Sequence, residues 1–334
     1  MMSPSSARPQ LDPAKAPSVS ELREFFFSGI TAEREALIQA IPRELATKGT
    51  VIITGASKGI GLDCVLMALR DRYVVVGLDL EPADLATEFK SERVSSIKTD
   101  ITDRGAIEAA LRSQAASTEG DIYLVCAAGV YSASNAELCM NVNYHGTINT
   151  VEIAKEVFGS RLKGIAMIGS DQSFFDKNSQ RSYGTQGIAP YMASKQALRE
   201  YYERLCDQAE SAQKPSFIAP ATVITPLTGN VMSELAPGAD LRSRVFANWQ
   251  KEHSDIPEGL LNPHHLAYVI VNSAIQRADR LSPALQTTIA SGQGILLDGK
   301  LNTRAEIITT SDRYRRFSLT DRHNFAVESM LSFD

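Results

Sequence analysis

The chain has 334 residues, of which 43% are hydrophobic and 22% charged, and its formal net charge is −5. This composition excludes the disordered, collagen-like and coiled-coil classes, and the length allows one large domain or two small ones. A membrane-spanning helix is not expected because no run of about 18 apolar residues occurs. Nucleic-acid binding is not expected because Lys and Arg form no basic stripe.

Residues 1–48 predict an N-terminal extension in two parts. Residues 1–20 are rich in Pro, Ser and Ala and lack the apolar core of a secretory signal, so they predict a flexible arm. Apolar residues at helical spacing within 21–46 predict an amphipathic helix. The cysteines lie far apart with no C-x-x-C pair, at Cys64, Cys126, Cys139 and Cys206. Free buried thiols and a reducing, cytoplasmic location are therefore expected.

Residues 49–300 alternate short β-branched runs with amphipathic helical stretches, which is typical of βαβ units. Strands are predicted at 50–54, 73–79, 94–98, 121–127, 164–169, 215–220 and 294–298. Helices are predicted at 59–71, 103–117, 136–159, 190–211 and 263–277. The prediction is an α/β fold: a single Rossmann-type doubly wound domain with a seven-stranded parallel sheet. Within it, 226–258 breaks the alternation and predicts a lid, and 301–334 predicts a C-terminal extension.

A glycine-rich loop follows the first predicted strand and opens a helix. Its residues are Gly55, Ala56, Ser57, Lys58, Gly59, Ile60 and Gly61. Such glycines allow a tight turn and let the backbone approach a pyrophosphate, whose charge the helix N-terminus stabilises. Asp79, at the end of the next predicted strand, can accept hydrogen bonds from the adenosine ribose hydroxyls. The combination favours a dinucleotide-binding site. The simpler alternative is a glycine-rich turn with a structural role alone.

Asp79 favours NAD over NADP, because its carboxylate would repel a 2′-phosphate. Lys58 is the opposing signal, since a cation beside the loop could pair with that phosphate. The aspartate would meet the phosphate directly, whereas Lys58 also fits a solvated loop lysine. NAD is therefore the predicted cofactor, and NADP is the alternative.

Tyr191 and Lys195 are spaced i, i+4 in a predicted helix and so share a face. After the fifth strand of a dinucleotide fold, this pair resembles the YxxxK signature of the short-chain dehydrogenase/reductase family. The segment from Thr54 to Gly61 is similar to the TGxxxGxG loop of that family's shorter single-domain branch. The resemblance covers about residues 49–300 and is more specific as an ordered set than any one motif.

Other segments extend the resemblance. Asn143 lies in a V-N-x-x-G-like segment, and Ser170 follows the fifth strand where the family keeps its catalytic serine. The Asp100 element is similar to the one that meets adenine, and Pro220 to Thr225 resembles PGxxxT. The cofactor contacts implied by the resemblance are Gly55, Ser57, Lys58, Gly59, Ile60, Gly61, Asp79, Leu80, Asp100, Ile101, Ala128, Gly129, Tyr191, Lys195, Val223 and Thr225.

Three departures from the family pattern affect the interpretation. Cys126 stands where the family has the first asparagine of N-N-A-G, and Ala221 replaces the glycine of PGxxxT. The spacing from Ser170 to Tyr191 is longer than is usual in the family, so Ser173 is a rival for the serine role. The first two changes remove no group that does chemistry, and the spacing is the more consequential departure.

The resemblance implies a proton-transfer site of Asn143, Ser170, Tyr191 and Lys195. An ordinary tyrosine, with a pKa near about 10, is a weak acid–base catalyst at neutrality. Lys195 and the nicotinamide charge are expected to lower the pKa of Tyr191, the general acid/base. Ser170 is expected to donate a hydrogen bond to the substrate oxygen, and Asn143 to hold a water linked to Lys195.

The predicted function is an NAD-dependent oxidoreductase that interconverts a secondary alcohol and a ketone on a small organic substrate, as a homodimer or homotetramer. The alternatives are an NADP-dependent carbonyl reductase and a non-catalytic dinucleotide-sensing regulatory protein. No metal site is predicted, because the adjacent His264 and His265 do not share a helix face and fit a solvated helix start better.

Overall fold

The sheet has eight parallel strands in the order β3-β2-β1-β4-β5-β6-β7-β8 within the part of the chain that the computed structural model describes. The described residues are 31–43, 48–174, 188–208, 215–221, 223, 225–228, 261–277, 280–281, 283–291, 293–298 and 313–318. The strands are β1 (Thr50–Thr54), β2 (Val74–Asp79), β3 (Val94–Lys98), β4 (Ile122–Cys126), β5 (Leu162–Ile168), β6 (Ser216–Pro220), β7 (Gly294–Asp298) and β8 (Tyr314–Ser318). All seven predicted strands are confirmed, and β8 adds an edge strand from the predicted C-terminal extension.

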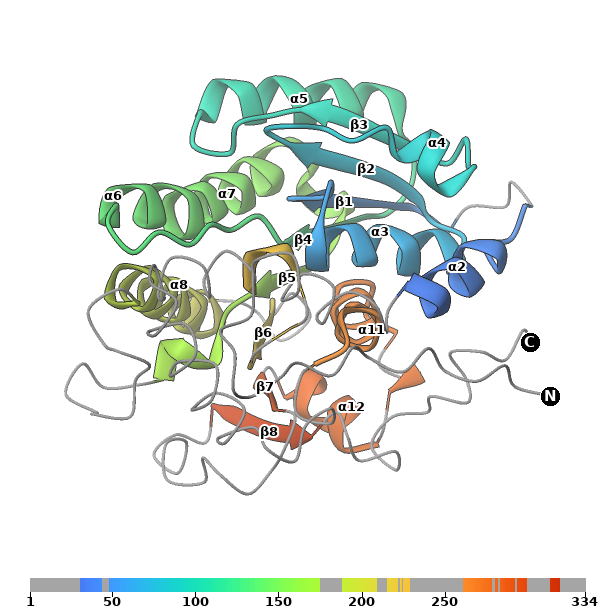
Figure 1. Ribbon diagram of the computed structural model, residues 1–334. Coiled ribbons are helices and arrows are strands. Elements are labelled where there is room, and N and C mark those ends of the chain that lie inside the picture. Colours follow the sequence, from blue (N-terminus) through green and yellow to red (C-terminus); the bar gives the residue numbers. More distant parts are fainter. Residues whose placement is uncertain are drawn as a thin grey trace, which may run out of the picture.

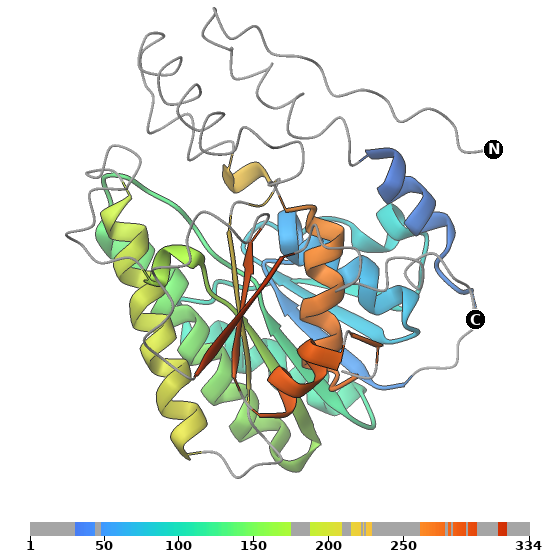
Figure 2. The ribbon, with the colours of Figure 1, turned by 90° about the horizontal axis from the view of Figure 1, so that it is seen from below.

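Helices cover both faces of this sheet (Figures 1 and 2). The helices are α2 (Thr31–Gln39), α3 (Gly59–Arg70), α4 (Leu85–Phe89), α5 (Arg104–Ser117), α6 (Ala136–Cys139), α7 (Thr147–Phe158), α8 (Ala189–Gln208), α11 (Pro263–Ala274) and α12 (Pro283–Ala290). The strand order reverses between β1 and β4, and ligands of open α/β sheets bind at such a point, outside the carboxyl ends of the strands.

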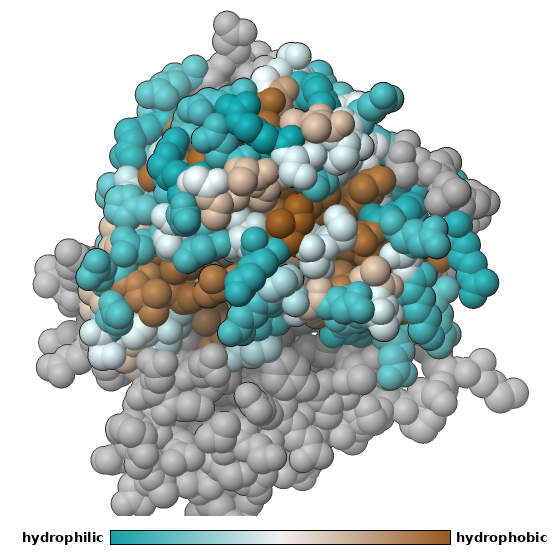
Figure 3. Space-filling model, turned by 90° about the horizontal axis from the view of Figure 1, so that it is seen from above, coloured by the Kyte–Doolittle hydropathy of each residue, from teal (hydrophilic) through white to brown (hydrophobic). Residues whose placement is uncertain are grey.

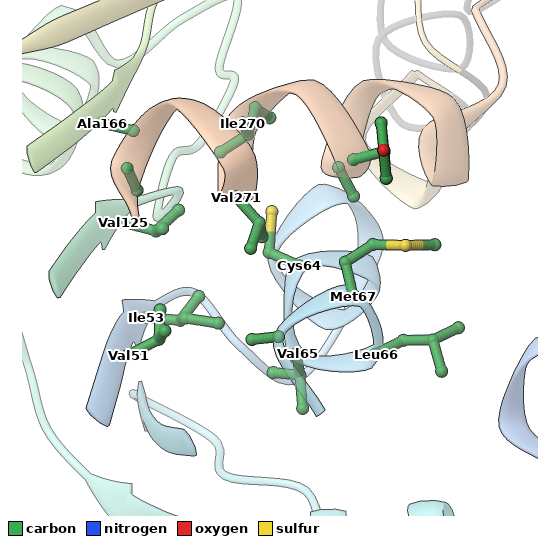
Figure 4. Packing of buried hydrophobic residues seen from close by; sticks show 14 of the residues in the cluster. Val51, Ile53, Cys64, Val65, Leu66, Met67, Val125, Ala166, Ile270 and Val271 are labelled. Carbon is green, nitrogen blue, oxygen red and sulfur yellow. The ribbon is translucent and has the colours of Figure 1, made fainter. Parts of the chain in front are cut away.

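Alternate residues of β1 pack into two hydrophobic layers, one on each face of the sheet. Val51 and Ile53 pack with α3 and α11, as Figure 4 shows, whereas Ile52 belongs to the layer under α5, α7 and α8. Seen from above, patches of hydrophobic residues lie among hydrophilic residues on the described surface (Figure 3). Among the described residues the exposed large apolar side chains are Leu80 and Leu138. Burial of each core side chain contributes about 1.5–3 kcal/mol, so both layers hold the strands in place.

The predicted helix 136–159 is divided in three. Between α6 and α7 lies a π-helix, Met140–Gly146. Gly146 packs so closely on Ile101 that a Cβ would lie 2.7 Å from its Cδ1. A π-helical turn inserts one residue per turn and rotates the following side chains, a feature often found at functional sites. Hydrophobic periodicity does not reveal it, because apolar residues continue on both sides.

Parts of both predicted extensions join the main sheet and its helices. In α2, Leu37 is buried in the core beside α3, and Arg34 donates to Glu88 Oε1 at 2.6 Å. The arm 1–20 and most of the predicted lid, from 229 to 258, lie outside the described residues. Cys64, Cys126, Cys139 and Cys206 form no disulfide; the first three are buried, and Cys206 is half-buried.

Candidate active site

The glycine-rich loop between β1 and α3 is a backbone cradle. Gly55 and Gly59 adopt positive φ angles of 68° and 59°, which side-chain-bearing residues rarely adopt. A Cβ on Gly61 would lie 2.1 Å from the Gly55 carbonyl oxygen, so only glycine allows this close approach. Lys58 precedes α3 without a capping hydrogen bond, and the first turn of α3 holds no acidic residue. The helix N-terminus is therefore suited to an anion such as a pyrophosphate.

Asp79 ties this loop to the end of β2. Its Oδ2 accepts from the Ser57 backbone N–H at 3.0 Å, and its Oδ1 accepts from the Glu81 N–H at 3.1 Å. Lys58 is exposed, and the neighbouring Leu80 is 56% exposed. The structure thus brings the predicted ribose-binding carboxylate, the loop and an apolar side chain to one edge of the switch point.

Four other predicted cofactor contacts follow the carboxyl ends of β3 and β4. Asp100 Oδ1 accepts from the Thr102 N–H at 2.8 Å, and the neighbouring Ile101 is buried. The Ala128 N–H donates to Thr54 Oγ1 at 3.2 Å. Gly129 lies where a Cβ would be 3.7 Å from Lys195 Nζ, so it borders the second part of the site.

The segment after β6 lies against the phosphate loop. The Thr225 Cβ is 3.6 Å from where a Cβ on Gly59 would be. Val223 forms an isolated parallel bridge with Leu261, and its carbonyl accepts from Thr228 Oγ1 at 2.5 Å. Thr225 therefore lies beside the cradle, and Val223 lies two residues before it in the same segment.

Ser170, Tyr191 and Lys195 meet at the end of β5. The side chains of Ser170 and Tyr191 form a hydrogen bond. Lys195 Nζ donates to the Ile168 carbonyl at 2.9 Å and lies 5.7 Å from the centroid of the Tyr191 ring. Tyr191 and Lys195 come from the first half of α8, so the predicted shared helix face is confirmed.

Ser173 points into its own turn. It is fully buried, and its Oγ donates to the Ser170 carbonyl at 2.6 Å. Of the two rival serines, Ser170 therefore touches the tyrosine.

Asp171 is a buried carboxylate that sequence reasoning missed. Ser170 Oγ donates to its Oδ1 at 3.3 Å, and Gln172 Nε2 donates to the same oxygen at 3.1 Å. The signal in the sequence is an acid placed directly after the candidate serine, but only the turn geometry shows it to be buried beside Tyr191.

The pKa of Tyr191 is raised above its usual value by the protein groups around it, and its lowering by Lys195 and the nicotinamide charge together stays a prediction. Burial of the phenol is the main cause, and the charges of Asp171 and Cys139 act in the same direction, while the hydrogen bond with Ser170 opposes them. Burial lowers the pKa of Lys195 to about 8, and the Cys139 charge opposes that shift.

The side-chain amide of Asn143 makes three hydrogen bonds to protein groups. Its Oδ1 accepts from the Val130 N–H at 2.7 Å, and its Nδ2 donates to the Val130 carbonyl and to Ser194 Oγ, each at 2.9 Å. Ser194 Oγ donates in turn to the Tyr191 carbonyl at 2.7 Å. The Asn143 side chain thus links the π-helix to α8, and its hold on a water linked to Lys195 stays a prediction.

His264 contradicts the predicted solvated helix start. Asn262 caps α11 as expected, accepting from the His264 N–H at 2.9 Å, with Pro263 next. The His264 imidazole, however, is fully buried, with its Nδ1 2.9 Å from Asp63 Oδ1. Within the described ranges, no cluster of three or more His, Cys, Asp or Glu could hold a metal ion. None of the helices found there is long and apolar enough to cross a membrane.

A sequence profile of the short chain dehydrogenase family matches residues 49–236. The chain belongs to this family. This short-chain dehydrogenase is 26% identical over 166 residues to an uncharacterized oxidoreductase of Schizosaccharomyces pombe (strain 972 / ATCC 24843). That match covers 46% of this chain and 56% of the relative, so the chain spans about half the length of that curated relative.

Solved structures share the fold of this short-chain dehydrogenase. Thermoplasma acidophilum aldohexose dehydrogenase in ligand-free form has a TM-score of 0.60 and 21% identity, covering 79% of this chain and 98% of that one. A 3-oxoacyl-[acyl-carrier protein] reductase from Brucella melitensis in complex with NAD has a TM-score of 0.58 and 18% identity. That match covers 76% of this chain and 97% of the reductase. The Rossmann-type architecture predicted from the sequence is thereby confirmed.

Proposed function

We propose that this chain is an NAD-dependent oxidoreductase that interconverts a secondary alcohol and a ketone on a small organic substrate. The observation that carries the proposal is the convergence of Ser170, Tyr191 and Lys195 at the end of β5. This group lies next to Gly129, which follows β4 at the switch point, on the same edge as the phosphate cradle. An acid–base group beside a dinucleotide cradle is suited to hydride transfer.

The cradle residues fit a nicotinamide dinucleotide. The Gly55–Gly61 loop and the α3 N-terminus would hold the pyrophosphate, and Asp79 the adenosine ribose. Leu80 and Ile101 would offer apolar surface to the adenine, with Asp100 beside them. Ala128, Gly129, Val223 and Thr225 would border the nicotinamide half, where Tyr191 and Lys195 lie. The Brucella melitensis relative bound to NAD supports this class of cofactor.

A bound nicotinamide would supply the hydride chemistry, with the substrate C–H hydrogen transferred together with both bonding electrons in oxidation and given back in reduction. Tyr191 handles the remaining proton: its phenolate takes the proton of the alcohol hydroxyl as the carbonyl double bond forms, and its phenol returns it in reduction. Ser170 donates a hydrogen bond to the substrate oxygen and stabilises its developing charge. The Lys195 ammonium, in the same pocket, favours phenolate. Asn143 acts by positioning, through Val130 and Ser194.

The test is a cofactor-absorbance screen over alcohols, sugars, hydroxy acids and hydroxysteroids with the wild type and Tyr191→Phe. Removal of the general acid/base is expected to reduce turnover by about 10²- to 10⁴-fold while NADH binding persists. Tyr201→Phe is the matched control, because it removes another part-buried phenol of α8 that bonds Glu152. Full activity of Tyr191→Phe contradicts the mechanism. Cofactor binding without turnover on the whole panel supports the sensing alternative.

NADP-dependent carbonyl reduction is the second candidate, favoured by the exposed Lys58 beside the loop. The Asp79 carboxylate, held by the Ser57 and Glu81 amides, opposes it because a 2′-phosphate would meet that charge. Dissociation constants for NAD and NADP decide between the two. Tighter binding of NADP would overturn the choice of NAD.

A further inference from the structure

The edge strand β8 lies level with the turn that carries Ser170. Strand register places Ile168, Ile218, Ile295 and Arg315 in one row across β5 to β8. Ile168 is the last residue of β5, and Arg315 is the second residue of β8. The stagger of the sheet therefore brings the beginning of β8 alongside the carboxyl end of β5, where the candidate site lies.

Tyr314, the first residue of β8, packs on both ends of this turn. Its ring is 7% exposed and meets the Phe174 ring edge-on, with centroids 4.8 Å apart. Phe174 is the last residue of the 3₁₀ turn Asp171–Phe174. The Tyr314 ring also lies 6.2 Å from that of Phe217, and a Cβ on Gly169 would be 2.2 Å from Phe217 Cζ. The segment from Gly169 to Phe174 is thus held at both ends by one aromatic cluster.

The same cluster is anchored on α8, the helix that carries Tyr191 and Lys195. Arg199 places its guanidinium 5.0 Å from the Phe174 ring centroid, and Glu203 Oε1 accepts from Tyr314 Oη at 2.8 Å. Asp207, one turn further on, pairs with Arg313 at 3.0 Å. Tyr314 therefore contacts both elements whose separation decides how Ser170 meets Tyr191.

We propose that Tyr314 is a positioning residue, whose ring packs β8 against Phe174 and α8 and so sets the place of Ser170 relative to Tyr191. The proposal rests on the proposed function of Ser170 and Tyr191. It predicts a selective effect, because β8 and the cofactor-binding strands β1 to β3 lie on opposite sides of β4. Loss of the Tyr314 ring should reduce turnover and leave the dinucleotide cradle intact.

The first experiment compares Tyr314→Ala, Tyr314→Phe and Tyr123→Ala in the full-length protein. Misplacement of a catalytic group is expected to lower kcat of Tyr314→Ala by about 10- to 100-fold, with the Kd for NADH unchanged. Tyr314→Phe keeps the ring and loses only the bond to Glu203, so it should retain turnover. Tyr123 is an equally buried tyrosine in an edge-on pair with Tyr73 at the start of β4, so Tyr123→Ala is a control for stability loss alone.

The second experiment needs no substrate. Hydrogen exchange of a peptide covering Gly169 to Phe174 should be faster in Tyr314→Ala, on the order of tenfold, and unchanged in Tyr123→Ala. Phe174→Leu removes the same ring contact from the side of the turn. It replaces Tyr314→Ala as the test variant if Tyr314→Ala does not fold. Combined with Tyr314→Ala, it should give non-additive losses of turnover, because the two residues share one contact.

The outcomes separate the two claims. If the wild type turns over no substrate while exchange at Gly169–Phe174 responds as expected, the proposed function fails and the positioning contact stands. If Tyr191→Phe is inactive but Tyr314→Ala keeps wild-type kcat and exchange, the positioning role is wrong. Equal losses of kcat in Tyr123→Ala and Tyr314→Ala also overturn it, since the effect is then general destabilisation.

Discussion

The phosphate loop and the serine turn are both short segments after parallel strands, but they are built in opposite ways. The loop between β1 and α3 depends on the backbone: positive φ angles at Gly55 and Gly59 and a Gly61 that approaches the Gly55 carbonyl. The turn after β5 depends on side chains, with Ser170 and Asp171 hydrogen-bonded together and Phe174 packed on Tyr314. A site formed by closely packed backbone has no room for an added side-chain atom. In a site formed by side chains, neighbouring residues set the positions and pKa values of the reacting groups.

Gly61→Ala should have the largest effect, because its Cβ would lie 2.1 Å from the Gly55 carbonyl oxygen. Overpacking of this kind costs about 1–3 kcal/mol and distorts the backbone that the pyrophosphate needs. We expect NADH binding to be lost in fluorescence titration and the Tm to fall. Gly105→Ala, in the first turn of α5, meets only Asp103 Oδ1 at 3.3 Å and should bind NADH normally. Wild-type NADH affinity in Gly61→Ala would contradict the cradle.

Ser170→Ala should come next, with kcat reduced by about 10²- to 10³-fold through loss of the hydrogen bond to the substrate oxygen. Ser173→Ala is the matched variant, since its hydroxyl donates only to the Ser170 carbonyl. It should lower the free energy of unfolding by about 1 kcal/mol and change kcat less. The assignment of the serine is wrong if kcat falls further in Ser173→Ala than in Ser170→Ala.

Asp79→Ala should weaken NAD binding by roughly tenfold or more, because hydrogen bonds to a charged group contribute about 1.5–3 kcal/mol. It should weaken NADP binding less, since it also removes a charge that repels the 2′-phosphate. Glu81→Gln removes a nearby exposed charge and keeps the backbone N–H that donates to Asp79 Oδ1. Isothermal titration with both dinucleotides measures the change. An unchanged ratio of the two affinities would show that Asp79 does not select the cofactor.

Asp171→Asn should have the smallest effect, a shift of the pH profile by roughly one unit. Alcohol oxidation needs Tyr191 deprotonated, so its rate rises as pH passes the pKa of Tyr191. The Asp171 charge raises that pKa, together with burial and Cys139, so its removal moves the rise to lower pH. Ser170 and Lys195 stay in place. Glu200→Gln, an exposed change of equal charge on α8, should leave the profile unmoved. A shift to higher pH in Asp171→Asn would refute this role.

The regular elements and the cradle were predictable from the sequence, because their signals are local. The run Thr50–Thr54 followed by glycines predicts a strand, a turn and a helix without knowledge of distant residues. The spacing of Tyr191 and Lys195 likewise places both on one helix face. Even so, periodicity could not show the π-helix at Asn143, whose conformation accompanies close packing of Gly146 on Ile101.

By itself the sequence determined seven of the strands and their alternation with helices, the backbone cradle, and the residue types of the candidate site. Only the tertiary structure decided which serine meets Tyr191, that Asp171 is buried beside it, and that Tyr314 reaches Phe174 from the far end of the chain. The physical reason is range. Backbone conformation follows from neighbours along the chain, whereas the pKa of Tyr191 and the position of Ser170 depend on burial and contacts between segments that only the folded sheet brings together.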